Sequence, residues 1–276
     1  MKLFRVIFSF LIICFPSFSS EPLPYYIIGG IGFTGFFSEF FEVIGAIDIL
    51  ERTETAGFEV NFENRGIYYQ STLGNNFWEY YFDPIKVEFQ KENKPTLFPV
   101  GYSTYARREM PLIRGKEIID TYIRIKPHIQ KEIGDFLENC FNGFHILGIH
   151  YRGTDKHLDS PKVDYDLFVA QISKYLDSIT GPKKIFVATD ECDFLNYIRA
   201  KFGDLVMACD IERSVKGEPI HYRGVNQYYY GKTALIDCLL ISHCDFLICN
   251  VSNLNRASRF FNPNLRAIEL NKHYCD

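Results

Sequence analysis

The chain lacks an excess of charge of either sign. It has 276 residues, with 30 Lys and Arg against 34 Asp and Glu, for a formal net charge of −4, and it has no acidic or basic tail. Nucleic-acid-binding proteins carry a broad basic surface, so we expect no nucleic-acid partner. Hydrophobic residues make up 47% of the chain, which is enough for one or two domains with packed cores.

No apolar run is long enough to span a membrane as a helix. The N-terminal run Val6–Phe15 is well short of the about 20 residues that cross a bilayer. Lys2 and Arg5 precede this run, and the small-residue pattern Ser17-Phe18-Ser19 follows it. The pattern predicts a signal peptide over residues 1–19, and hence a secreted, periplasmic or ER/Golgi-luminal protein. An uncleaved signal anchor is the alternative, and only then would the protein contact a membrane.

Metal-binding cysteine patterns are absent as well. Of eight Cys, Cys14 would leave with the signal peptide, and no Cys-x-x-Cys or Cys/His pair has the spacing of zinc ligands. We therefore expect mostly free thiols, with one or two disulfides as the alternative, and no metal site. Asp164-Tyr165-Asp166 has the spacing of a metal-binding acidic pair. It precedes an expected helix, however, and acidic side chains there cap the helix N-terminus and interact favourably with its dipole, which is the interpretation we prefer.

Two common catalytic motifs are missing. No G-x-S-x-G elbow is present, which disfavours a serine hydrolase. Gly231-Lys232-Thr233 has the ending of a phosphate-binding P-loop, but the first glycine of that motif would fall on Asn226. Neither chemistry is therefore expected.

What the chain does contain, after Phe144, is an alternation of short apolar runs with amphipathic stretches. This alternation predicts βαβ units and a parallel sheet of Rossmann-like type. The expected strands are His145–His150, Lys184–Thr189, Leu205–Cys209, Asp245–Asn250 and Arg266–Leu270. The expected helices are Tyr165–Ser178, Asp193–Lys201, Lys232–His243 and Ser252–Phe261.

The first half of the chain shows a weaker form of the same pattern. It predicts strands at Tyr25–Ile31 and Phe58–Phe62 and a helix over Thr34–Glu51. The polar stretch from Lys86 to Leu112 indicates an irregular connector. Helical structure is expected from Ile113 to Phe141, with a break at its proline.

The segment Ile146–Lys156, ILGIHYRGTDK, is the most informative one. Its apolar residues form a strand that ends in His150, Arg152, Asp155 and Lys156. In open α/β sheets, ligands bind beyond the carboxyl ends of the strands. Arg offers a planar fork of donors that fits phosphate oxygens, and Lys adds a mobile charge. The segment predicts a phosphate-binding site, with ordinary surface charge at a strand end as the alternative.

Asp237 is the second informative residue, because it lies in an expected helix that is apolar nearly all round. A buried carboxylate needs a partner. A nearby Arg or a backbone N–H would serve, and so would two donors on a ligand, such as the N1 and N2 hydrogens of guanine. Ser252 follows a strand and suits the N-cap of the next helix, where free amides would also hold a diphosphate. The glycosylation sequon Asn250-Val251-Ser252 falls on this loop, and we expect it to be accidental.

A glycine cluster, Gly29-Gly30-Ile31-Gly32, follows the first expected strand and precedes a helix. Such a loop lets a ligand approach the backbone closely, so Gly30 and Gly32 are candidate binding residues, with turn geometry alone as the alternative. Asp190 follows the strand that ends at Thr189 and faces the same crevice as Arg152. We expect it to contact a sugar or a nucleotide.

These segments resemble the motifs of a known family. His150–Lys156 resembles the donor-binding motif of the α1,6-fucosyltransferases, the nodulation fucosyltransferases and, more loosely, the protein O-fucosyltransferases. Phe186–Asp190 is similar to the second motif of this GT-B fucosyltransferase superfamily, and Ala234–Asn253 resembles the third. The three motifs occur in the right order. The family has a second arginine where this chain has Gly153.

The resemblance implies an α/β fold of GT-B type, with two Rossmann-like domains whose parallel sheets face each other across a cleft. Residues 20–140 would form the acceptor-side domain, and residues 141–276 the nucleotide-sugar-binding domain. The resemblance further implies an inverting, metal-independent transfer of fucose from GDP-fucose to a glycan or glycoprotein acceptor, without a cofactor.

The resemblance also implies residue roles. Arg152 would be catalytic, because it would neutralise the leaving diphosphate, where preorganised donors act most strongly. His150 would contact the diphosphate, and Asp237 would read guanine. Ser252 and Asn253 would hold phosphate. The full expected donor-binding set is His150, Arg152, Asp155, Lys156, Asp190, Asp237, Ser252, Asn253, Gly30 and Gly32.

Two alternatives to fucosyl transfer stay open. One is a transferase that uses another nucleotide sugar. The other is an inactive, secreted GT-B module that binds a glycan or nucleotide, which Gly153 and the short N-terminal half would explain.

An inverting transfer also needs a base near the acceptor hydroxyl. Glu39 and Glu79 are the candidates on the N-terminal side, each with a solvent-facing or packing role as its alternative.

Overall fold

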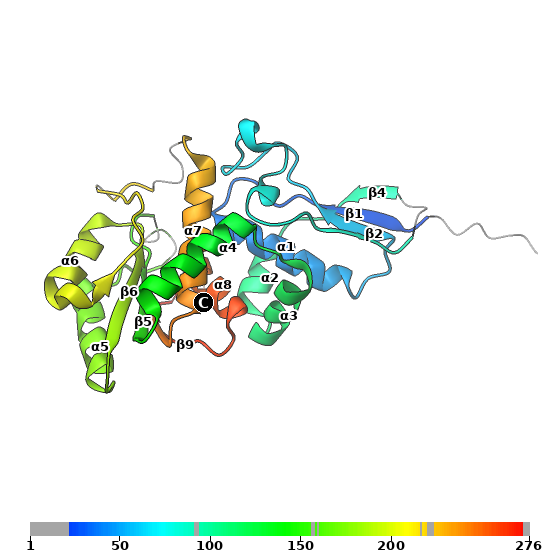
Figure 1. Cartoon of the computed structure of the whole chain (residues 1–276). Helices are drawn as coiled ribbons and strands as arrows, with labels where there is room; N and C mark the ends of the chain where they lie inside the picture. The colour runs from blue at the N-terminus through cyan, green and yellow to red at the C-terminus, as the bar shows by residue number, and fades with distance from the viewer. Residues whose placement is uncertain are drawn as a thin grey trace, which may run out of the picture.

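The computed structural model describes residues 22–90, 94–155, 158, 160–215, 217–219 and 224–272. The predicted signal peptide and Lys156 lie outside these residues. The chain forms two sheets, with helices packed between them (Figure 1). Among the described helices, none combines the length and the apolar character that crossing a membrane requires.

The N-terminal sheet has the strand order β3-β2-β1-β4. Its strands are β1 (Pro24–Ile28), β2 (Gly57–Val60), β3 (Lys86–Glu88) and β4 (Lys94–Leu97). β1 pairs in parallel with β2 and β4, whereas β3 pairs antiparallel with β2. The sheet is therefore mixed rather than wholly parallel. Helix α1 (Phe36–Leu50) connects β1 to β2 and is buried on nearly every face.

The prediction of an irregular connector from Lys86 to Leu112 was wrong. This stretch contains the edge strands β3 and β4 and the short helix α2 (Ser103–Arg108). Both strands are largely exposed, so their sequences lack the apolar alternation that marks a strand. Pro95 lies in β4, where an edge position tolerates the missing N–H. The buried carboxylate of Glu42 accepts hydrogen bonds from the two amides that lead into α2.

The C-terminal sheet has the order β7-β6-β5-β8-β9, and all of its strands are parallel, as the alternation predicts. The strands are β5 (His145–Tyr151), β6 (Lys183–Thr189), β7 (Val206–Met207), β8 (Phe246–Cys249) and β9 (Arg266–Glu269). The helices are α5 (Tyr165–Asp177), α6 (Cys192–Phe202), α7 (Gln227–Ser242) and α8 (Asn253–Phe261). His150 is in register with Ala188 and Cys249, so the loops after β5, β6 and β8 leave the sheet at one edge.

Helices α3 (Leu112–Tyr122) and α4 (Pro127–Phe136) and a π-helical turn (Leu137–Phe141) join the halves. The predicted helical region with its break at Pro127 is confirmed, because Pro127 opens α4, where its missing N–H costs nothing. One apolar core runs through both halves. Phe41 of α1 packs edge-on against Phe260 of α8. The halves are thus packed against each other.

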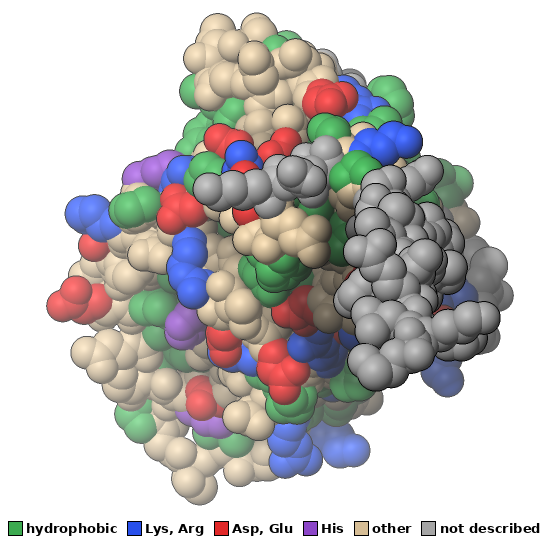
Figure 2. All heavy atoms as spheres, turned by 90° about the vertical axis from the view of Figure 1, so that its right-hand side faces the viewer, with side chains coloured by type: hydrophobic (Ala, Val, Ile, Leu, Met, Phe, Trp, Pro, Cys, Tyr) green, Lys and Arg blue, Asp and Glu red, His purple; other side chains and the backbone are tan. Residues whose placement is uncertain are grey.

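The remaining sequence expectations concern charge and cysteine. Lys and Arg side chains alternate with Asp and Glu on the face at the right of Figure 1, without a broad area of one sign among the residues drawn in colour (Figure 2). All six Cys in the described part of the chain are free thiols, and three of them, Cys238, Cys244 and Cys249, are buried in the core.

Candidate active site

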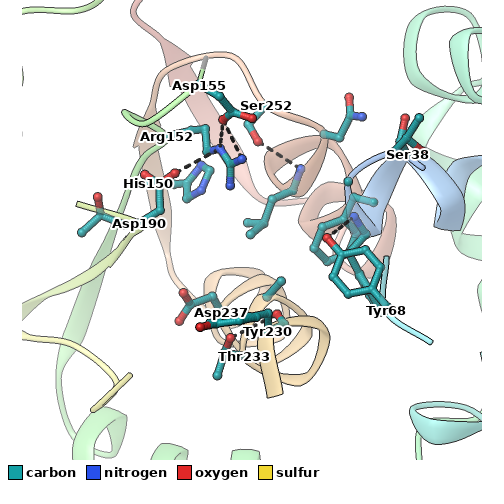
Figure 3. Close-up of a pocket in the computed structure, with 18 of the residues that line it drawn as sticks. Ser38, Tyr68, His150, Arg152, Asp155, Asp190, Tyr230, Thr233, Asp237 and Ser252 are labelled. Carbon is teal, nitrogen blue, oxygen red and sulfur yellow. Dashed lines mark hydrogen bonds and ion pairs between the residues drawn. The ribbon is translucent and has the colours of Figure 1, made fainter. Parts of the chain in front are cut away.

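A cavity of about 390 Å³ lies between the C-terminal edge of the second sheet and the start of α1. Figure 3 shows Asp237 rising from α7, Arg152 from the end of β5, and Ser38 and Tyr68 on the opposite side. The described lining residues are Phe33–Ser38, Tyr68, His150, Arg152, Asp155, Thr189, Asp190, Ile211, Glu212, Tyr230, Thr233, Ala234, Asp237 and Ser252–Leu254.

The cavity brings together most of the predicted donor-binding residues. Those that line it are His150, Arg152, Asp155, Asp190, Asp237, Ser252 and Asn253. Lys156 lies outside the described residues. Gly30 and Gly32 do not line the cavity. The three loops and α7 meet here because parallel strands end at the same edge of their sheet.

Arg152 is the sole Lys or Arg among the described lining residues. Its Nη2 and Nε lie 2.7 and 3.0 Å from Asp155 Oδ1, and its Nε lies 3.1 Å from Asp190 Oδ2. Burial opposes the charge, but the two carboxylates outweigh it and raise the pKa of the guanidinium above its ordinary value. The side chain stays 27% exposed, so a fixed cation faces the cavity.

Asp190 and Asn250 hold the loop that carries Arg152. Asp190 Oδ1 accepts from Gly153 N at 2.9 Å, and Oδ2 accepts from Thr154 Oγ1 at 2.6 Å. The amide of Asn250 accepts from Arg152 N at 2.9 Å and donates to Arg152 O at 2.8 Å. Asn250 is 2% exposed, so the sequon nitrogen is engaged inside the fold, in keeping with an accidental sequon.

The packing around position 153 explains why this residue is a glycine, where the fucosyltransferases that the chain resembles have a second arginine. A Cβ at this position would lie 2.2 to 2.5 Å from the carboxylate atoms of Glu191. Glu191 is buried and accepts a hydrogen bond of 2.6 Å from Tyr165 Oη. The carboxylate fills the space that a side chain at position 153 would need, so this position supplies no second arginine beside Arg152.

Asp237 is 6% exposed, and its Oδ1 has no hydrogen-bond partner among the described residues. Burial raises the pKa of this carboxyl to about 7, against the attraction of Arg213 and a hydrogen bond from the Cys209 thiol. Arg213 itself donates to the carbonyl oxygens of Cys209 and Ile211. Arg213 therefore fits the arginine partner expected for Asp237 only through its nearby charge. Oδ1 of Asp237 is left for another donor.

Ser252 caps α8, since its Oγ accepts from Leu254 N at 3.3 Å, as its position in the sequence predicts. The neighbouring Asn253 has a buried side-chain Oδ1 without a hydrogen-bond partner among the described residues. Asp164 likewise caps α5 through Asp166 N, at 2.9 Å, which confirms the capping interpretation of that acidic pair. Within the described ranges, no group of three His, Cys, Asp or Glu could hold a metal ion.

The predicted role of the glycine cluster needs correction. Gly30 and Gly32 have φ values of +60° and +86°, and a Cβ at position 30 would lie 2.3 Å from Phe62 and 2.5 Å from Glu39 Oε2. The glycines permit a tight turn around Glu39. The amide of Gly32 donates to Glu39 Oε1 at 2.8 Å, so the anion that this loop binds is a carboxylate of the protein itself.

Glu39 is therefore a structural carboxylate. It is 2% exposed and also accepts from Ile31 N at 2.9 Å, from Thr34 N at 3.1 Å and from Thr34 Oγ1 at 2.6 Å. Burial raises the pKa of Glu39, and these donors partly counter the shift. Glu39 does not line the cavity, and neither does Glu79, which accepts from Asn76 Nδ2. Both candidate bases are thus engaged by donors of the protein outside the cavity lining.

Several lining residues were missed in the sequence. Tyr230 and Thr233 precede Asp237 by seven and four positions on α7, a helical spacing that could have identified them. Tyr68 accepts from Phe36 N at 2.9 Å, a contact between distant segments for which the sequence has no signal. Glu212 lines the cavity and accepts from Tyr230 Oη at 2.9 Å.

Comparison with known proteins adds to this geometry. No protein-family model matches the chain. The chain is 26% identical over 160 residues to nodulation protein Z of Bradyrhizobium diazoefficiens, and 25% identical over 163 residues to that of Sinorhizobium fredii. Each match covers 54% of this chain. It covers 43% of the Bradyrhizobium protein and 50% of the Sinorhizobium protein, so the match spans about half the length of these curated relatives.

The fold extends the similarity to nearly the whole chain. The match to a crystal structure of NodZ α-1,6-fucosyltransferase co-crystallised with GDP covers 91% of this chain and 95% of the NodZ chain, with a TM-score of 0.64 at 17% identity. A NodZ crystal soaked with GDP-fucose covers 90% and 94%, with a TM-score of 0.61 at 18% identity. The chain is a distant homologue of nodulation protein Z. The predicted resemblance is confirmed, and so is the predicted α/β fold of GT-B type, which here is NodZ-like, except that β3 makes the N-terminal sheet mixed rather than parallel.

Proposed function

We propose that the cavity binds a GDP-sugar and that the protein is an inverting fucosyltransferase acting on a glycan or protein acceptor. The observation that carries the proposal is the buried Oδ1 of Asp237, which lacks a partner among the described residues. Leaving such an oxygen unpaired is costly. Guanine offers adjacent N1–H and N2–H donors on its Watson–Crick edge, which match a carboxylate.

Arg152 supplies the second part of the proposal. Transfer leaves negative charge on the departing diphosphate, and a cation held in place before the reaction stabilises that charge without reorganisation. Asp155 and Asp190 hold the guanidinium in this way. NodZ structures with GDP and with GDP-fucose support the donor class. No cofactor takes part in the proposed reaction, and no metal ion is required.

Isothermal titration with GDP, IDP, ADP and UDP tests the donor assignment. We expect GDP to bind tightest, and IDP, which lacks the 2-amino group, to bind about tenfold more weakly. Asp237→Asn should lose the preference for GDP, because the amide replaces one acceptor by a donor. Asp177→Asn on the exposed surface of α5 is the matched control. ADP or UDP binding as tightly as GDP would contradict the proposal.

A second candidate is a binding module without transferase activity. The observation in its favour is the pair Gly153 and Glu191, which leaves Arg152 as the sole Lys or Arg among the described lining residues. Incubation with GDP-fucose and a broad glycan array separates the candidates. Full GDP-fucose affinity without transfer or donor hydrolysis would favour the module. Turnover with a different nucleotide sugar, in a donor panel with a fixed acceptor, would favour another transferase.

A further inference from the structure

The cavity wall contains a second polar atom that the described part of the protein does not satisfy. Asn253 is the first residue of α8 and lines the cavity. Its side-chain Oδ1 is buried and has no hydrogen-bond partner among the described residues. A buried acceptor without a partner costs free energy. The oxygen therefore indicates a hydrogen-bond donor on the ligand, as Oδ1 of Asp237 does elsewhere in the cavity.

The fold fixes Asn253 close to Arg152. The side-chain amide of Asn250, three residues before Asn253, accepts from Arg152 N at 2.9 Å and donates to Arg152 O at 2.8 Å. Figure 3 shows Ser252 and Arg152 on the side of the cavity away from α7, the helix that carries Asp237. The start of α8 thus adjoins the cation proposed to hold the diphosphate, and not the carboxylate proposed to read the base.

A phosphate group is the wrong partner for Oδ1. The oxygens of an ionised diphosphate accept hydrogen bonds, so they suit the backbone N–H groups at the start of α8 but not a side-chain carbonyl oxygen. In a nucleotide sugar, the sugar is attached to the terminal phosphate and therefore lies next to the diphosphate. Each of its hydroxyl groups can donate a hydrogen bond. A sugar hydroxyl is thus the donor that the position and the chemistry of Oδ1 favour.

We propose that the side chain of Asn253 binds the sugar of the nucleotide-sugar donor, with Oδ1 accepting a hydrogen bond from a sugar hydroxyl group. The inference rests on the proposed function and adds to it a residue that recognises the transferred sugar rather than the GDP. The expected contact of Asn253 with phosphate would then fall to its backbone N–H alone. Loss of the side chain should weaken binding of GDP-fucose more than binding of GDP.

Isothermal titration of Asn253→Ala and Asn253→Asp with GDP and with GDP-fucose, without an acceptor, tests the sugar contact. The quantity compared is the Kd of GDP divided by the Kd of GDP-fucose, because effects on the shared diphosphate cancel in this ratio. Asn253→Ala should lower the ratio about tenfold, the cost of leaving a buried hydroxyl group unpaired. Asn253→Asp should keep the wild-type ratio, because a carboxylate oxygen also accepts from a hydroxyl group.

Both variants suit the fold. At the first position of α8, Asp interacts favourably with the helix dipole, and Ala is a strong helix former. Their urea midpoints should therefore stay close to that of the wild type. Asn196→Ala, at an exposed position of α6 outside the cavity, is the control and should keep the wild-type ratio. Chromatography after each titration checks that GDP-fucose is intact, because hydrolysis would release GDP.

The outcomes separate the inference from the function on which it rests. An unchanged ratio in Asn253→Ala, with GDP binding intact, overturns the sugar contact and leaves the fucosyltransferase proposal standing. A ratio that falls as far in Asn253→Asp as in Asn253→Ala also overturns it, because Oδ1 would then not be the contact atom. Absence of GDP binding in the wild type would refute the proposed function, and the inference with it.

Discussion

Burial of Asp237 should make stability fall with rising pH by a predictable amount. The folded protein raises the pKa of this carboxyl from 3.8 to about 7. One pKa unit corresponds to about 1.4 kcal/mol, so a shift of about three units amounts to about 4 kcal/mol of unfolding free energy. A raised folded-state pKa means that this stability is fully present below about pH 4 and is lost as the pH rises through about 7.

Urea unfolding of wild type and Asp237→Asn, from about pH 4 to pH 8, measures the effect. The Asn side chain does not ionise, whereas other titrating groups cancel in the difference between the two proteins. The unfolding free energy of the variant minus that of the wild type should therefore rise by about 4 kcal/mol across this range. Asp177→Asn should show a small and nearly constant difference. A constant difference for Asp237→Asn would refute the reasoning, because the carboxyl would then titrate alike in both states.

Further predictions concern catalysis, packing, metal ions and processing. Arg152→Ala should lower kcat about 10²- to 10³-fold in a transfer assay, and unchanged turnover would remove Arg152 from the mechanism. Gly153→Ala should lower the unfolding free energy, measured by urea unfolding, by about 1–3 kcal/mol, because the added Cβ meets the buried Glu191. Wild-type stability of this variant would show that Glu191 moves freely. Activity should survive EDTA, and loss that manganese restores would indicate a metal site. Sequencing of the exported protein should find a new N-terminus after Ser19, and an intact residue 1 would favour the signal anchor.

Much of the C-terminal half could be predicted because local and global signals agree there. The apolar strand β5 ends abruptly in His150 and Arg152, and the carboxyl ends of parallel strands define where a ligand binds. Asp237 is conspicuous as a single carboxylate in an otherwise apolar stretch of helix. His150, Arg152 and Asp237 all line the cavity. Boundaries of the domains, and the roles of the lining residues, stay predictions.

The rest depends on contacts between segments that the sequence does not connect. The glycine cluster looks like a ligand loop, yet Gly32 N donates to Glu39. Gly153 looks like a lost arginine, yet Glu191 fills its space. Tyr68 joins the cavity through the amide of Phe36. In the first two cases a protein group takes the place where sequence patterns suggest a ligand or a charge, and in the third the sequence has no signal at all.

The most direct test of the central claim is the GDP affinity of wild type and Asp237→Asn by titration calorimetry between about pH 5.5 and pH 8. Both donors of guanine can bond to Asp237 only after the carboxyl has lost its proton, because the protonated group presents an O–H donor at one of its two oxygens. The wild-type affinity, divided by that of the variant to cancel titration of the diphosphate, should therefore fall about tenfold per unit as the pH drops below about 7. A ratio near one, or a ratio that does not change with pH, would contradict the assignment of Asp237 as the reader of guanine.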